Sequence, residues 1–160
     1  MSTMYVDNLR EKTLDNGVHI PGHVVQFKYN VITTNSGSTT SSSMVDISPF
    51  YIDITPKNAN NIIVLETNFT AAVTGTNSYA RFRIIDSNNN NTQWSSGTYI
   101  GAFGYKVIDS WHEVIIRTAN PAGTTNAMRL QLQGFVTADS LEWAWSGGDR
   151  RIISATEIAQ

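Results

Sequence analysis

The chain has 160 residues and a formal net charge of −2, which fits one globular domain and argues against charge-driven nucleic-acid binding. Only 15% of the residues are charged, whereas Asn, Thr and Ser together make up 48 residues, or 30% of the chain. These neutral polar residues suit exposed strands and turns better than helix interiors. Cysteine is absent, which excludes disulfides, thiol catalysis and cysteine zinc sites.

Neither a membrane span nor a targeting signal is predicted. No apolar run approaches the roughly 18 residues that a helix needs to cross a bilayer. Residues 1–4 lack a basic region followed by an apolar stretch, so we expect no secretory signal. We therefore expect no membrane insertion.

Residues 1–21 are predicted to form an N-terminal arm, separate from a folded domain over residues 22–160. Pro21 and Gly22 would end any regular element at this boundary. The arm packs either on its own domain or on a neighbouring chain. A segment without a core of its own usually folds on binding, which favours assembly with a neighbour. Its apolar residues are too scattered to form a core, and they are Val6, Leu9, Leu14, Val18 and Ile20.

From residue 23 onward, the dominant signal is period-two alternation in short runs, which predicts strands. The first run places Val25, Phe27, Tyr29 and Val31 on one face. With this run, about nine or ten runs occur at roughly ten-residue spacing, the pattern of an antiparallel β-sandwich. We therefore predict an all-β, jelly-roll-like sandwich with an extended arm. The runs cover residues 23–32, 49–55, 61–73, 78–85, 92–100, 105–108, 111–118, 128–136, 141–145 and 152–158.

Two segments between or beside these runs need separate interpretation. Residues 35–43 are rich in Ser, Thr and Gly and are predicted to form a loop. Residues 110–113 have the spacing of a helix capping box. The following residues 114–116 are all β-branched, which is costly in a helix, so a strand is predicted there instead.

The histidines and the Asp86–Asn91 cluster do not predict a metal site. His19 and His23 lie in an extended arm, where they could share a metal only if a symmetry axis collected several copies. The cluster over residues 86–91 resembles a calcium loop but lacks the glycine at its sixth position and the distant glutamate. A solvated hairpin turn is predicted instead, and no metal or cofactor is expected.

No arrangement of residues predicts catalysis. The acidic residues show no recognisable spacing for a carboxylate pair of the kind that hydrolyses sugars. Ser110, His112 and Glu113 are close in sequence, but adjacent strand residues point to opposite faces, which argues against a triad. We predict that the chain is not an enzyme.

Aromatic residues crowd the second half of the chain, where two interpretations compete. They can form core or subunit interface, as expected for Trp143 and Trp145 on one strand face. They can also offer stacking platforms for sugar rings. For that role, Trp94 is the best candidate for an exposed ring, followed by Tyr99 and Tyr105.

Four segments in collinear order resemble marine phage and cyanophage tail-fibre proteins. They are DNLREKT at residues 7–13, GVHIPGHVVQ at 17–26, TPKNANNIIV at 55–64 and ISATEI at 153–158. The resemblance implies a virion component, usually a homotrimer, whose arm connects a distal sandwich to the particle. It also implies synthesis in the cytoplasm of a bacterial host. Residues 86–123 match nothing in that family, so receptor choice cannot be carried over.

The predicted function is therefore that of a bacteriophage structural protein of tail-fibre type. Its partners would be copies of itself, other virion proteins reached through the arm, and a host-surface glycan. A head decoration or capsid fibre protein is one alternative. A free-standing carbohydrate-binding lectin module is another, and it would need no partner chain.

Overall fold

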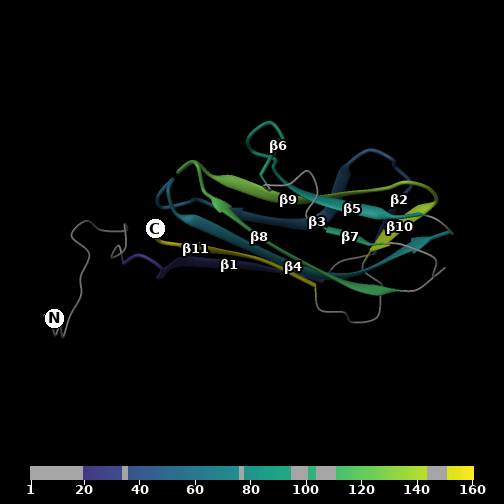
Figure 1. Ribbon diagram of the computed structural model, residues 1–160, viewed down its shortest axis with the longest axis horizontal. Coiled ribbons are helices and arrows are strands. Elements are labelled where there is room, and N and C mark those ends of the chain that lie inside the picture. The colour runs from purple at the N-terminus through teal and green to yellow at the C-terminus, as the bar shows by residue number, and fades with distance from the viewer. Residues whose placement is uncertain (1–19, 34–35, 76–77, 95–100, 104–110, 144–150) are drawn as a thin grey trace, which may run out of the picture.

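The computed structural model describes residues 20–33, 36–75, 78–94, 101–103, 111–143 and 151–160 (Figure 1). Within these ranges the protein is all-β and contains no helix. Accordingly, no helix in the described part of the chain is long and apolar enough to cross a membrane. The described residues form these strands: β1 (Val24–Ile32), β2 (Gly37–Thr39), β3 (Val45–Ile54), β4 (Ile62–Thr74), β5 (Ala80–Asp86), β6 (Thr92–Gln93), β7 (Gly101–Phe103), β8 (His112–Pro121), β9 (Met128–Val136), β10 (Ser140–Trp143) and β11 (Arg151–Ile158).

The strands form two antiparallel sheets, which we call sheet A and sheet B. In sheet A, the long strand β4 pairs with β8 on one side. On its other side, the first part of β4 pairs with β11 and the last part pairs with β10. β1 pairs with the outer edge of β11, and β2 pairs with the outer edge of β10. In sheet B the order is β3, β9, β5, and β5 then pairs with both β6 and β7. The chain alternates between the sheets, with β1, β4, β8 and β11 in sheet A and β3, β5 and β9 in sheet B. This is the arrangement of a jelly roll and confirms the predicted fold class.

The core lies between the two sheets and is centred on three phenylalanines. Phe69 of β4 contacts Phe50 of β3 at a centroid distance of 5.0 Å and Phe82 of β5 at 5.4 Å, the second pair edge to face. All three side chains are fully buried. Sheet A and sheet B therefore meet through aromatic rings, which bury large areas and prefer such tilted contacts.

β1 alternates as predicted from Gln26 onward, whereas an irregularity between Val24 and Gln26 interrupts the alternation at Val25. Its apolar face points away from the core. Phe27, Tyr29 and Val31 are 57%, 64% and 47% exposed. On the opposite face, the Gln26 side-chain amide donates to the Thr55 carbonyl at 2.8 Å and the Asn30 amide donates to the Tyr51 carbonyl at 3.4 Å. These amides satisfy backbone carbonyls on β3 and just beyond it, so the polar face of β1 closes the seam between the sheets.

Both ends of the described chain lie at one end of the sandwich, which we call the terminal pole (Figure 1). The Gly22 N–H donates to the Ala159 carbonyl at 2.8 Å, and the Ala159 N–H donates to the His23 carbonyl at 3.0 Å. Along sheet A, the start of β1 is in register with the end of β11, the start of β4 and the end of β8. The strands therefore run between this terminal pole and an opposite pole, where β2 and β10 lie.

The predicted strands agree with the observed ones in most places. β8 is a strand, as the β-branched run after residue 113 indicated. β2, however, lies inside residues 35–43, which were expected to be a loop, so that prediction was wrong for Gly37–Thr39. β3 also begins earlier than expected, at Val45. The predicted strand over residues 105–108 lies outside the described residues.

Candidate functional site

Two hollows open at the terminal pole on either side of Met128, a buried residue that lines both. The larger is a groove of about 400 Å³ between β1, the end of β3 and the start of β9. The smaller hollow, of about 180 Å³, lies between the β5–β6 hairpin and the segment before β9. The strand ends of both sheets converge here, so residues far apart in sequence share one surface.

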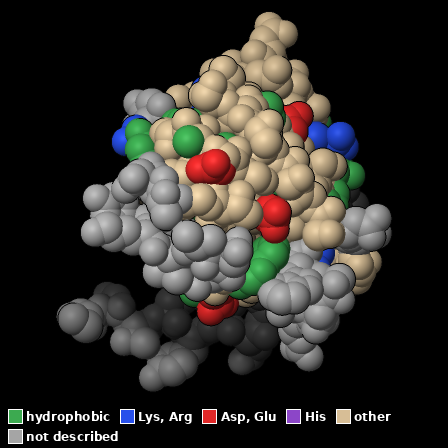
Figure 2. Space-filling model, turned by 90° about the vertical axis from the view of Figure 1, so that its right-hand side faces the viewer, with side chains coloured by type: hydrophobic (Ala, Val, Ile, Leu, Met, Phe, Trp, Pro, Cys, Tyr) green, Lys and Arg blue, Asp and Glu red, His purple; other side chains and the backbone are tan. Residues whose placement is uncertain are grey.

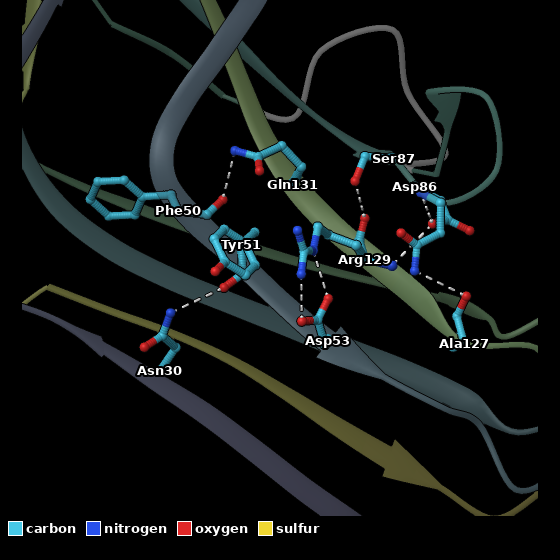
Figure 3. A network of polar contacts seen from close by, with 10 residues as sticks. Asn30, Phe50, Tyr51, Asp53, Asp86, Ser87, Ala127, Arg129 and Gln131 are labelled. Carbon is cyan, nitrogen blue, oxygen red and sulfur yellow. Dashed lines mark hydrogen bonds and ion pairs between the residues drawn. The ribbon is translucent and has the colours of Figure 1, made fainter.

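The groove contains a fixed ion pair on sheet B (Figure 3). The Arg129 guanidinium donates to both oxygens of Asp53, at 2.8 and 2.9 Å, and lies 4.3 Å from the centroid of the Tyr51 ring. The hydrogen bond and the negative charge of Asp53 raise the pKa of Arg129 above its ordinary value, so the guanidinium keeps its proton. A bidentate pair of this kind holds both side chains in one orientation.

Asp86 organises the hairpin beside the groove. Its carboxylate, which is buried, accepts hydrogen bonds from the N–H groups of Asn88 and Arg129, both at 3.1 Å. The Asn88 side-chain amide in turn donates to the Ala127 carbonyl at 3.3 Å (Figure 3). Because Asp86 is committed to backbone groups, it fixes the loop geometry and is not displayed as a free ligand.

The turn itself confirms the predicted hairpin over residues 86–91. The Thr92 N–H donates to the Asn89 carbonyl at 2.9 Å, and Asn90 and Asn91 have φ angles of 51° and 57°. Positive φ at both central residues defines a type I′ turn, which matches the twist of paired strands and which asparagine tolerates well.

A buried carboxylate anchors the wall of the groove. Glu157 of β11 is fully buried and accepts hydrogen bonds from the backbone N–H groups of Lys57 and Asn58 at 2.8 and 3.3 Å. The side-chain amides of Gln26 and Asn61 donate to the same carboxylate at 2.5 and 2.7 Å. Glu157 thus ties the loop between β3 and β4 to β1 and β11, and it holds Lys57 at the rim of the groove.

Trp94 lines the smaller hollow, but it is less accessible than expected. Its ring is half-buried and packs against the core, so the prediction of an exposed ring was wrong. Residues 92–94 continue from the type I′ turn, and the Trp94 N–H donates to the Ile84 carbonyl at 3.0 Å, which draws the ring inward. The indole Nε1–H is buried and has no hydrogen-bond partner. Trp94 therefore lines the hollow with part of its side chain while its indole N–H stays buried. Ligand binding by this residue stays a prediction.

The remaining predicted residues have different fates. Tyr99 and Tyr105 lie outside the described residues, as do Val6, Leu9, Leu14, Val18 and His19. Ile20 is described and exposed, and His23 uses its ring nitrogen Nδ1 within the turn, 2.5 Å from the Ile20 carbonyl oxygen. Trp143 is buried in the core, one of the two roles considered for it. The residues that the structure describes contain no cluster of three or more His, Asp or Glu that could hold a metal.

Sequence analysis missed the groove residues. The groove residues Lys28, Asp53, Lys57 and Arg129 come from four separate segments. The pairing of β3 with β9 brings Asp53 to Arg129, and the hydrogen bonds of β1 to Tyr51 and Thr55 bring Lys28 beside them. The one usable signal was the polar face of β1, whose side chains had to meet something other than an apolar core. Chemically the groove offers three cationic groups, one carboxylate and several amides, so it suits polar or acidic groups of a partner.

Comparison with known proteins relates the chain to others through fold alone. No protein-family model and no curated protein matches the sequence. A mutant VP2 protein of infectious bursal disease virus, in derived T=1 particles, aligns with 99% of this chain and 44% of its own, with a TM-score of 0.50 and 12% identity. A second structure of T=1 particles derived from infectious bursal virus aligns with 98% of this chain and 41% of its own, with a TM-score of 0.49 and 13% identity. The chain spans less than half the length of these matched chains.

Proposed function

We propose that the protein is a structural, non-enzymatic subunit of a virus particle, of the bacteriophage tail-fibre type, and that it works as a homo-oligomer. The observation that carries the proposal is the jelly roll, which the VP2 protein of infectious bursal disease virus shares over nearly the whole of this chain. Fold alone does not fix function. The collinear resemblance of four sequence segments to phage tail-fibre proteins is the independent reason for choosing this role.

The position of the chain ends suggests how such a subunit would be oriented. If residues 1–21 connect the domain to the particle, the terminal pole faces the particle and the opposite pole faces outward. Figure 2 views the molecule from the side of the opposite pole, where backbone and uncharged polar side chains (tan) dominate the described surface and charged and hydrophobic side chains are scattered. The two hollows would then lie on the particle side. We therefore assign the groove with Asp53 and Arg129 to contact with neighbouring virion proteins.

Labelling of intact particles tests the role. An antibody against the chain, with gold detection by electron microscopy, should decorate the tail fibres of particles of the virus that encodes it. Mass spectrometry of the same purified particles should detect the chain. Absence of the chain from purified particles would contradict the proposal, and labelling confined to the head would replace tail fibre with head decoration.

The assembly part of the proposal is tested by light scattering. The full-length chain of 17.7 kDa should have about three times that mass in solution. A chain that begins at Pro21 should have a lower mass if the arm contributes to assembly. A full-length monomer whose mass does not change on truncation would contradict both statements.

A carbohydrate-binding module is the second candidate, because one observation favours it. Trp94 lines a hollow with the neutral polar residues Asn89, Gln93 and Thr124, a combination of an aromatic ring and polar groups that suits a small polar ligand such as a sugar. Titration with bacterial surface glycans should then change tryptophan fluorescence in the wild type and not in Trp94→Phe. No change at millimolar glycan would remove this candidate.

A further inference from the structure

We propose that the outward face of sheet A beside β1 packs against a second copy of this chain. The inference rests on the proposed function, since it names the surface through which copies of the subunit assemble. It starts from Phe27, Tyr29 and Val31, whose side chains lie on the solvent side of the sheet. Phe27 and Tyr29 stack on each other with ring centroids 5.9 Å apart, so they already form a flat aromatic surface.

Apolar residues recur on this face on all four neighbouring strands of the sheet. Val31 of β1 pairs with Ile152 of β11, Ile152 pairs with Asn68 of β4, and Asn68 pairs with Ile115 of β8. Directly paired residues on neighbouring strands share one face of the sheet. Ile115 is 71% exposed, so the face that begins at one edge of the sheet ends at the other edge with a second exposed apolar residue. Asn68 interrupts this row, but the row of Phe27 adds Val64 of β4 and Ala119 of β8 on the same face. A surface with this many apolar side chains in water is typical of an interaction site.

The outward face of sheet B shows what a water-facing sheet of this protein looks like. Besides the pair of Asp53 and Arg129, the Gln133 amide donates to Asp46 at 2.7 Å and the Arg83 Nε–H donates to Gln133 at 2.8 Å. Polar side chains on that face thus bond to one another along the sheet. The two faces belong to the same sandwich, so the contrast is a property of sheet A and not of the overall composition.

The size and flatness of the face favour another sheet as its cover. The face is four strands wide, at about 4.8 Å per strand, and as long as the nine residues of β1, at about 3.3 Å per residue. It therefore measures roughly 19 by 30 Å. The resulting area of about 570 Å² is at the low end of the roughly 600 to 1,000 Å² per partner of a stable interface. A single extended segment would cover only one or two of the four strands. A second sheet, packed face to face at about 10 Å, would cover all of them.

The charges on this face permit a copy of the same chain to approach it. Across the sheet from Tyr29, the paired residues in this row are Ser154 of β11, Glu66 of β4 and Arg117 of β8. Arg117 Nε lies 3.1 Å from the Glu66 carboxylate. The two opposite charges balance each other, so this row does not repel an approaching copy. A partner with a strongly charged surface would find no complementary charge here.

Variants of the full-length chain test this interface by light scattering between about 1 and 100 µM. Phe27→Thr and Ile115→Thr keep β-propensity but remove apolar surface, and the double variant should dissociate to lower mass at concentrations where the wild type is assembled. Tyr79→Thr, before β5 at the edge of sheet B, removes an aromatic of 36% exposure outside the face and is the matched control. Its mass should equal that of the wild type, and circular dichroism should show all variants folded.

Hydroxyl-radical footprinting of the wild type gives a second reading that needs no substitution. Phe27 and Tyr29 should become protected as the concentration rises, while Tyr79 should not. If the wild type assembles but the double variant keeps its mass, or if Phe27 and Tyr29 react equally at all concentrations, the inference is overturned while the proposed function stands. Protection at all concentrations in a monomer would assign the face to residues 1–19 of the same chain and also overturn it. Antibody labelling of particles decides the proposed function separately.

Discussion

Glu157 illustrates how single residues fix the shape of the terminal pole. Its carboxylate is fully buried and collects hydrogen bonds from two backbone N–H groups and from the amides of Gln26 and Asn61. A buried charge is tolerated only when such bonds replace water. The residue therefore connects β1, β11 and the loop that carries Lys57 through hydrogen bonds.

Glu157→Ala should destabilise the protein by roughly 2 to 4 kcal/mol, because several donors would lose their buried acceptor. Urea unfolding followed by circular dichroism measures the effect as a lower midpoint. Glu113→Ala, at an exposed position of β8, is the control and should change stability by less than about 0.5 kcal/mol. Equal midpoints for the two variants would show that the hydrogen bonds of Glu157 contribute little.

The residue scale also marks a limit of sequence reasoning. Alternation in β1 correctly separated Phe27 and Tyr29 from Gln26 and Asn30. It could not tell which set faces the core, because that choice depends on the carbonyls of Tyr51 and Thr55, about 20 to 30 positions away. For the same reason Trp94 was judged by its polar neighbours in sequence, while its burial is set by core packing.

At the scale of elements, the β5–β6 hairpin depends on two residues in the left-handed region. Asn91→Gly should keep or slightly raise stability, because glycine adopts this conformation freely and Asn-Gly is the preferred pair in type I′ turns. Asn91→Val should lower stability by about 1 to 2 kcal/mol, since a β-branched residue is strained at a φ of 57°. Thermal melting compares the two variants, and a melting temperature of Asn91→Val equal to that of Asn91→Gly would contradict the turn assignment.

β2 pairs with β10 and is held by a close approach of backbone to Trp143. A Cβ atom added to Gly37 would lie 2.5 Å from Cζ2 of that buried ring. Gly37→Ala should therefore displace Trp143, cost about 1 to 3 kcal/mol and shift tryptophan emission. Ser38→Ala, at an exposed position in the same strand, should do neither. If Gly37→Ala melts and emits like Ser38→Ala, the contact does not constrain β2.

β2 also explains why one element escaped prediction. A strand of three residues in a stretch of Ser, Thr and Gly carries no apolar alternation. Its existence depends on β10 and on the fit of glycine under Trp143, both of which are tertiary. Longer strands such as β9, predicted with its observed bounds at residues 128–136, carry their own signal because four of their side chains enter the core.

At the scale of the whole molecule, fold class was predictable and the functional surface was not. Strand number and spacing are properties of the sequence, and they indicated a jelly roll. The groove around Arg129 and the apolar face of sheet A both arise from which strands become neighbours. Period-two patterns do not encode that pairing.

The apolar face leads to a prediction about salt. If copies assemble through Phe27, Tyr29 and Ile115, raising NaCl from about 0.05 to 1 M should leave the assembled mass unchanged or increase it, because burial of apolar surface is not screened by ions. Light scattering across this range is the measurement. Dissociation at high salt would indicate that ion pairs between copies, and not apolar contact, hold the copies together.

The meeting of the two chain ends also decides how the domain would respond to a mechanical load. β1 and β11 are antiparallel neighbours, and Ile20 and Gln160 leave the sandwich at the same corner. A force pulling these two points apart would break the hydrogen bonds between β1 and β11 one after another, starting at the terminal pole. The bonds would not share the load, as they would if the strands were sheared along their length. This pair of strands would therefore resist such a load less than a pair that is sheared along its length. Peeling away β1 would also remove Gln26 from the buried carboxylate of Glu157, so the first bonds to yield would loosen the groove as well.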